Sequence, residues 1–158
     1  MNQNFDENLI KGRIAETIFE EMFSEVGEFI ILPAGYEFKT PELAQELLKI
    51  ERKDILDNLR HSPDFILLSE NPNRKDVFLV EVKYRTNIST EEIKKIAEEL
   101  TNKYGTVYIF VASHDNFYFD YCRNIVKNNG TIQPLAEVWV RKELQQKYLR
   151  LLNEFISR

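Results

Sequence analysis

Three charged residues of this chain have types and a spacing that suit binding of a metal ion beside a phosphate. Asp64 comes directly before the apolar run 65–68. Glu81 comes directly after a second apolar run, 77–80, and Lys83 lies two residues further on. The two runs flank a turn-rich stretch, which predicts an antiparallel hairpin with Asp64 opposite Glu81. Because side chains alternate along a strand, Glu81 and Lys83 share a face. We therefore expect two carboxylates and an ammonium on one patch.

Such a patch matches the needs of phosphodiester hydrolysis. The reaction requires neutralised charge on the phosphate and an activated water, and carboxylate-bound Mg²⁺ or Mn²⁺ supplies both. Asp64 and Glu81 would be the ligands, with the backbone carbonyl of Val82 as a further oxygen. Lys83 would orient the water or stabilise the phosphate. Without a cation, the alternatives are a turn aspartate at 64 and a solvated ion pair on the strand, each common in proteins.

The surrounding pattern predicts an α/β domain with a mixed sheet. Apolar residues recur at helical spacing from Ile10 to Val26, and Ser89 opens a capping-box pattern that Gly105 closes. A proline after Thr40 marks the start of another helix. The expected elements are helices at 10–26, 41–60, 89–105 and 141–156, and strands at 29–32, 64–68, 77–83, 106–112, 117–121 and 136–140.

Composition restricts the class of protein. The chain has 158 residues, 43% of them hydrophobic, which fits one globular domain. No apolar stretch reaches the roughly eighteen residues of a membrane span, and the first residues lack a secretory pattern, so we expect a cytoplasmic protein without a membrane partner. The lone cysteine, Cys122, rules out an internal disulfide, and with two histidines it cannot form a Cys/His zinc cluster.

The charge distribution gives a mixed signal about partners. The net charge is −5, and residues 1–60 contain 13 acidic against 7 basic side chains. This acidity argues mildly against a nucleic-acid partner. Residues 61–158 are nearly neutral, which leaves room for a local basic surface.

The motif residues resemble a known family. Ser62-Pro63-Asp64 with Glu81-Val82-Lys83 resembles the PD-(D/E)xK motif of the restriction-endonuclease-like nuclease superfamily, and residues 11–16, ending in Ala15-Glu16, resemble the Gly-x-x-Ala-Glu helix of its Holliday-junction-resolvase-like branches. The resemblance covers roughly residues 8–113. It implies a restriction-endonuclease-like three-layer core in a single domain 1–158, with a helical insertion at 41–60 and a C-terminal extension from 114.

The resemblance also implies roles and a function. Asp64 and Glu81 would bind Mg²⁺ or Mn²⁺, Lys83 would orient the water, and Glu16 would be a further acid from the helix. The implied activity is that of a metal-dependent endonuclease on nucleic acid, DNA rather than RNA, in which cutting both strands would involve a homodimer. Arg85 and His61 are additional candidates for substrate binding. Arg85 could contact a phosphate, although an exposed arginine leaving the strand fits equally well. His61 could lie near the metal, although a loop residue is the better explanation.

Two alternatives to a nuclease remain open from the sequence. One is a nuclease-like domain that no longer cuts and serves as a binding or assembly module, which the acidic first half favours. The other is an unrelated α/β protein with an accidental motif. A separation between Asp64 and Glu81 of more than about 10 Å would establish the latter, because one ion cannot bridge that distance.

Overall fold

Five strands form one mixed sheet in the order in which they occur along the chain. The computed structural model describes residues 3–34, 63–70 and 76–157. The third and fourth strands are parallel, and the other three neighbouring pairs are antiparallel. The elements are α1 (Gln3–Val26), β1 (Phe29–Pro33), β2 (Phe65–Ser69), β3 (Val77–Tyr84), α4 (Thr90–Tyr104), β4 (Val107–Ala112), β5 (Phe117–Tyr121), α5 (Cys122–Lys127) and α6 (Lys142–Ile156). The predicted α/β class with a mixed sheet is therefore confirmed.

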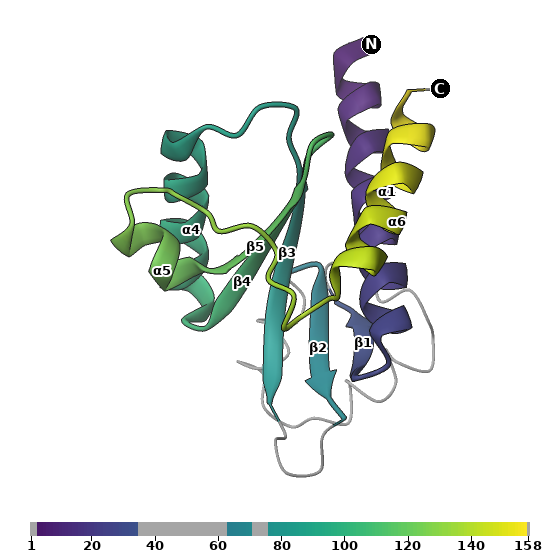
Figure 1. Ribbon diagram of the computed structural model, residues 1–158. Coiled ribbons are helices and arrows are strands. Elements are labelled where there is room, and N and C mark those ends of the chain that lie inside the picture. Colours follow the sequence, from purple (N-terminus) through teal and green to yellow (C-terminus); the bar gives the residue numbers. More distant parts are fainter. Residues whose placement is uncertain (1–2, 35–62, 71–75, 158) are drawn as a thin grey trace, which may run out of the picture.

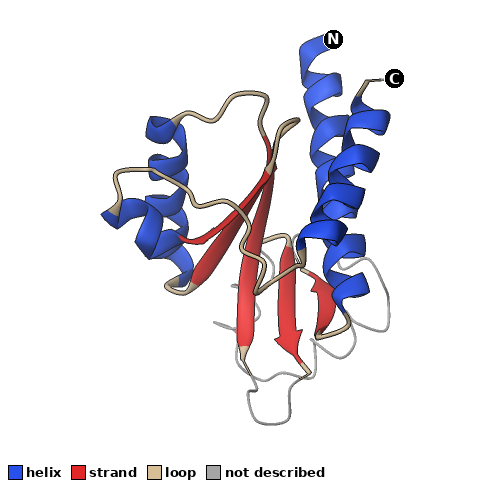
Figure 2. Cartoon of the chain, viewed as in Figure 1, coloured by secondary structure: helices blue, strands red, loops and turns tan. Residues whose placement is uncertain are grey.

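Helices cover both faces of the sheet (Figure 1, Figure 2). α1 and α6 lie side by side on one face, and α4 and α5 pack together on the other. The alternation of side chains in β3 decides what each face receives: Val80 and Val82 join the core under α1, whereas Leu79 packs with the core under α4. Phe19 and Phe23 of α1 fill the first core and contact Phe110 at ring-centroid distances of 5.1 and 6.3 Å.

The hairpin of β2 and β3 has the register that its sequence predicts. Phe65 pairs with Val80, and each following residue of β2 pairs with the preceding residue of β3. Continuing this register by one residue sets Asp64 opposite Glu81. β3 is longer than β2, and its residues 81–84 run past the start of β2 while they stay paired with β4. Among the described residues, no strand pairs with this end of β3 on the side of Asp64, and this side is called the free edge below.

Local signals placed most of the helix ends correctly. α1 ends before Gly27, which has a φ of +80°. Ser89 caps α4, and its Oγ accepts a hydrogen bond from the Glu92 N–H at 3.3 Å. The α4 helix ends at Gly105 as expected. Among the described residues, no helix has the length and apolar character needed to cross a membrane.

One predicted element is wrong, and one was missed. Residues 136–140 do not form a strand: the N–H groups of Trp139 and Val140 bond the Ala136 carbonyl in a turn. The apolar residues there serve packing instead, since the Trp139 ring lies against Phe29 and other aromatic side chains. Residues 122–127 form the short helix α5, for which the sequence carries no cap or periodicity signal that predicted it. The helix expected at 41–60 lies outside the described residues.

Candidate metal and phosphate site

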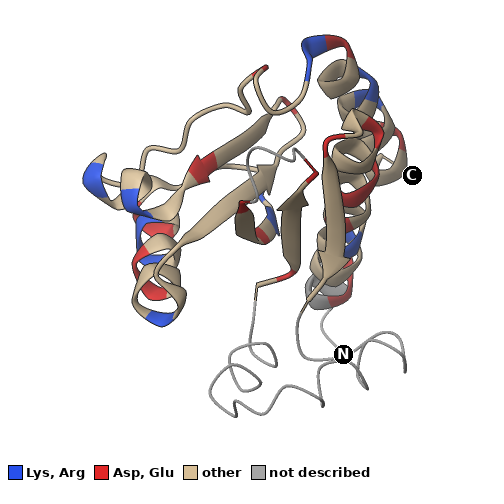
Figure 3. Ribbon diagram, turned by 90° about the horizontal axis from the view of Figure 1, so that it is seen from below, with Lys and Arg blue, Asp and Glu red and all other residues tan. Residues whose placement is uncertain are grey.

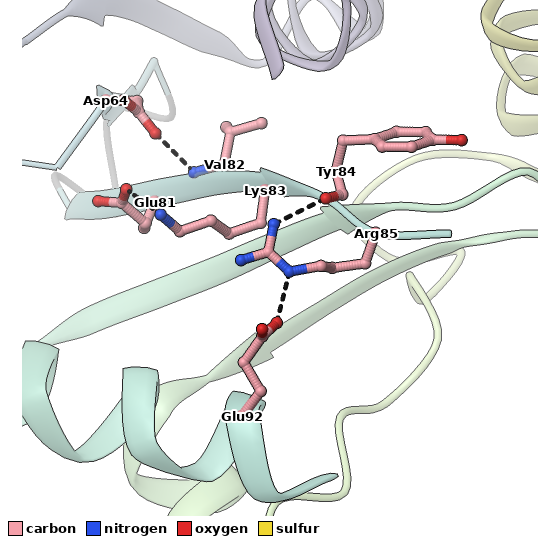
Figure 4. A network of polar contacts seen from close by, with 7 residues as sticks. All are labelled: Asp64, Glu81, Val82, Lys83, Tyr84, Arg85 and Glu92. Atoms are coloured by element: carbon pink, nitrogen blue, oxygen red, sulfur yellow. Dashed lines mark hydrogen bonds and ion pairs between the residues drawn. The ribbon is translucent and has the colours of Figure 1, made fainter. Parts of the chain in front are cut away.

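Asp64 is fixed between two strands by its backbone and by its side chain. Its carbonyl accepts a hydrogen bond from the Ala34 N–H at 2.8 Å. Its Oδ2 accepts one from the Val82 N–H, also at 2.8 Å (Figure 4). Because β2 begins only at Phe65, the Asp64 carboxylate takes the position of a ladder carbonyl for the overhanging part of β3. The site thus depends on β3 being longer than β2.

The same geometry bears on the Val82 carbonyl. The N–H and C=O groups of one residue in an extended strand point toward the same neighbouring strand. The Val82 N–H reaches Asp64, so the Val82 carbonyl faces the same free edge. This orientation agrees with the oxygen ligand expected from the sequence.

Glu81 and Lys83 lie on the face of β3 that is turned toward α4. The Lys83 Nζ is 3.4 Å from the Glu81 Oε1, and the side chains are 32% and 19% exposed respectively. Both are next to the Asp64–Val82 contact in Figure 4. The structure therefore brings together Asp64, Glu81 and Lys83, as the register predicted.

The two carboxyl groups interact unfavourably when both are charged. Burial, and then the charge of Asp64, raises the pKa of Glu81 from 4.5 to about 7. A hydrogen bond between the two carboxyls acts in the same direction, while Lys83 partly opposes it. A bound cation would relieve this repulsion, since it favours the charged form of both acids. The pair is thus chemically suited to hold a positive ion.

Arg85 is held on the α4 side of the strand. Its Nε donates to the Glu92 carboxylate, and its Nη1 donates to the Tyr84 carbonyl at 2.8 Å (Figure 4). Glu92 was not predicted as a partner, although its place in the first turn of the capped helix put it near the strand end. A phosphate contact by Arg85 would require exchange of this ion pair.

A buried acid, Asp120, lies in the same row of the sheet as the half-buried Glu81. Ile109 of β4 pairs with Glu81 on one side and with Asp120 on the other. Asp120 accepts hydrogen bonds from the N–H groups of Tyr121 and Gln133, at 2.8 and 3.3 Å. It therefore has a structural role, holding the chain after α5 against β5.

Burial, with the charges of Asp120 and Glu81, raises the pKa of Cys122 to about 12, so this thiol stays protonated.

Glu16 and His61 are the remaining residues that the sequence predicted for the site. Glu16 is half-buried on α1, between Lys11, which lies over the Tyr84 ring, and Phe19, which contacts Phe65 at 5.1 Å. Within the described part of the chain, no three His, Cys, Asp or Glu side chains form a metal-binding group. A role for Glu16 as a third acid stays a prediction. His61 lies outside the described residues.

A pair of carboxylates is still a suitable metal site. Mg²⁺ usually takes one or two carboxylates and fills its remaining positions with waters and substrate oxygens. The separation that would mark an accidental motif is not observed, because the Asp64 carboxylate accepts a hydrogen bond from the N–H of Val82, the residue that follows Glu81. Basic and acidic residues are interspersed on α4 and α6, whereas the charged residues of α1 from Glu16 onward are all acidic (Figure 3). Charge alone therefore does not single out a nucleic-acid face on them.

Comparisons with known proteins add no family to this description. No protein-family model matches the chain, and no curated protein is similar to it in sequence.

Proposed function

We propose that this protein is a metal-dependent nuclease that hydrolyses phosphodiester bonds in DNA. The observation that supports the proposal is the convergence of Asp64, Glu81 and Lys83 where β3 runs past β2. The element order of the described residues, helix, three strands, helix and strand, is also the order that the resemblance to the PD-(D/E)xK nucleases implies.

Each residue has a defined task in this proposal. Asp64 and Glu81 would hold the cation, with the Val82 carbonyl as a further oxygen ligand. The cation supplies charge neutralisation on the phosphate and lowers the pKa of a water. Lys83, which contacts Glu81, would be available to the phosphate or the attacking water once a cation balanced the glutamate.

A cleavage assay tests the proposal. Purified protein is incubated with linear, nicked, branched and single-stranded DNA, and with RNA, in Mg²⁺ and in Mn²⁺. Wild type should cut at least one substrate only with metal, and Asp64→Asn or Lys83→Ala should lower the rate at least a hundredfold. The matched controls Glu99→Gln and Lys103→Ala, exposed on α4, should cut as wild type does. Lack of cleavage of every substrate under both metals would refute the proposal.

A binding module without cleavage is the second candidate. The absence of a third metal-binding side chain among the described residues favours it, because fewer ligands hold a cation less tightly. Calorimetry with Mn²⁺ separates the two functions. Heat of binding that Asp64→Asn abolishes supports the nuclease, whereas no binding by wild type supports the module.

A further inference from the structure

A lysine and a tyrosine from distant parts of the chain meet beside the candidate site. The Lys11 Nζ of α1 lies over the Tyr84 ring at the end of β3, 5.8 Å from its centroid. Both residues are half-buried. Tyr84 is three residues past Glu81, or about 10 Å along the strand. Glu81 and Lys83 point to the opposite face of β3 from Tyr84, so a nucleic-acid strand with a phosphate at the acid pair would have to cross the edge of β3 beyond β2 to bring a neighbouring nucleotide to this ring.

The ring lies at the edge of the site. Figure 4 shows Tyr84 on the side of β3 that carries the Val82 side chain, away from Arg85. The inner part of the ring packs against the core under α1, which fixes its position. The ion pairs that the described residues form with one another use Lys83, Arg85 and Lys147, and none of them holds Lys11. Its ammonium can therefore leave the ring without breaking one of these pairs.

The two side chains match the two parts of a nucleotide. An unpaired base stacks on an aromatic ring, and this contact contributes more than an exposed contact between an ammonium and a ring. A base that takes the place of Lys11 on Tyr84 releases the ammonium to bind a phosphate of the same strand. A duplex cannot make this exchange, because its bases are already stacked.

We propose that Lys11 and Tyr84 receive a nucleic-acid strand with unpaired bases, with a base on the Tyr84 ring and a phosphate on Lys11. This inference rests on the proposed nuclease function and names its substrate class. The expected substrates are single strands, frayed ends and flaps, and blunt duplexes are excluded.

Fluorescence anisotropy in the absence of divalent metal measures the binding of a labelled strand without cleavage, and so tests the inference directly. The probes are a labelled single-stranded DNA, the same sequence as RNA and a blunt duplex, each at several salt concentrations. The variants are Lys11→Ala, Tyr84→Ala and Tyr84→Phe. The matched controls are Lys103→Ala and Tyr104→Ala, since Lys103 also lies over a tyrosine ring, at 5.2 Å, on α4. Thermal unfolding checks that each variant is folded.

Wild type should bind at least one single strand more tightly than the duplex. Tyr84→Ala should weaken that binding roughly tenfold, Tyr84→Phe less than about twofold, and the controls little. Lys11→Ala should reduce the salt slope by about 0.7, the value of one phosphate contact. If Tyr84→Ala does not fold, Tyr84→Leu, which keeps an apolar side chain without a ring, takes its place.

Several results would overturn the inference. They are preferred binding of the duplex, no binding of any probe, an unchanged affinity without the Tyr84 ring, or equal losses in the Lys103 and Tyr104 controls. Mn²⁺ calorimetry on the same samples keeps the proposed function separate. Metal binding that depends on Asp64 would leave the metal site standing when the strand contact fails, and its absence would refute the metal site itself.

Discussion

Glu81→Gln should make this protein more stable at pH 8 in the absence of divalent metal. The folded structure raises the pKa of Glu81 from 4.5 to about 7, so the folded state binds this proton more tightly than the unfolded state does. Stability from this group is therefore fully present below pH 4.5 and is lost as the pH rises to about 7. Glutamine keeps the shape of the side chain and removes the charge.

The magnitude follows from the rise in pKa. At about 1.4 kcal/mol for each pH unit, the rise corresponds to a loss on the order of 3 kcal/mol at pH 8. The pKa of about 7 already includes the opposing effect of Lys83, so the contact with Lys83 needs no separate subtraction. We expect Glu81→Gln to raise the free energy of unfolding at pH 8 by about 3 kcal/mol.

Urea unfolding between pH 4 and pH 8, followed by circular dichroism, is the assay. The wild-type free energy of unfolding should fall across this range more steeply than that of Glu81→Gln, with the exposed Glu99→Gln as a control that follows wild type. Saturating Mn²⁺ should reverse the order, because the cation stabilises wild type by about 4.1 kcal/mol at a thousand times its Kd, whereas the variant has lost one of the two carboxylate ligands. A variant less stable than wild type at pH 8, or one with the same pH slope, would refute the reasoning.

Two other predictions concern the packing of the helices. Gly130→Ala should lower stability by about 2–3 kcal/mol, because Gly130 has a φ of +92° and an added Cβ would lie 2.0 Å from the Thr90 carbonyl oxygen. Gly12→Ala should instead raise stability by about 0.5–1 kcal/mol, because an added Cβ within α1 meets no atom within 4 Å. Equal effects of the two substitutions in thermal unfolding would contradict this account. Glu25 shows the opposite linkage to Glu81: a hydrogen bond from Tyr148, and then Lys147, lowers the pKa of Glu25, so its contribution exists above pH 4.5 and is lost as the pH falls through the lowered value. Glu25→Gln should therefore lower the melting temperature at pH 7, and by progressively less as the pH falls below 4.5, whereas an equal loss at every pH would point to lost packing instead of charge.

The centre of the site could be predicted from the sequence because a hairpin links its residues. The equal spacing of Asp64 and Glu81 from the turn sets them opposite each other, and two-residue alternation sets Lys83 beside Glu81. Both rules act locally and leave no other register that buries Phe65 and Val80 together. The observed pairing of these two residues agrees with that reasoning.

Contacts between distant elements could not be predicted in the same way. The position of Lys11 over Tyr84 depends on how α1 lies across the sheet, and no local periodicity specifies that angle. The error at 136–140 has a related cause: the apolar residues suggested a strand, but the Trp139 ring packs against aromatic side chains from β1, β3 and β5. Val138 remains 84% exposed, which a buried strand would not allow.

The most direct test of the central claim is a crystal structure of this protein soaked in Mn²⁺, with anomalous scattering used to locate the ion. We expect one Mn²⁺ about 2.0–2.6 Å from carboxylate oxygens of both Asp64 and Glu81, and the Lys83 ammonium released from Glu81. An anomalous map without a peak between the two carboxylates, with Lys83 still paired to Glu81, would contradict the metal site and the nuclease function built on it.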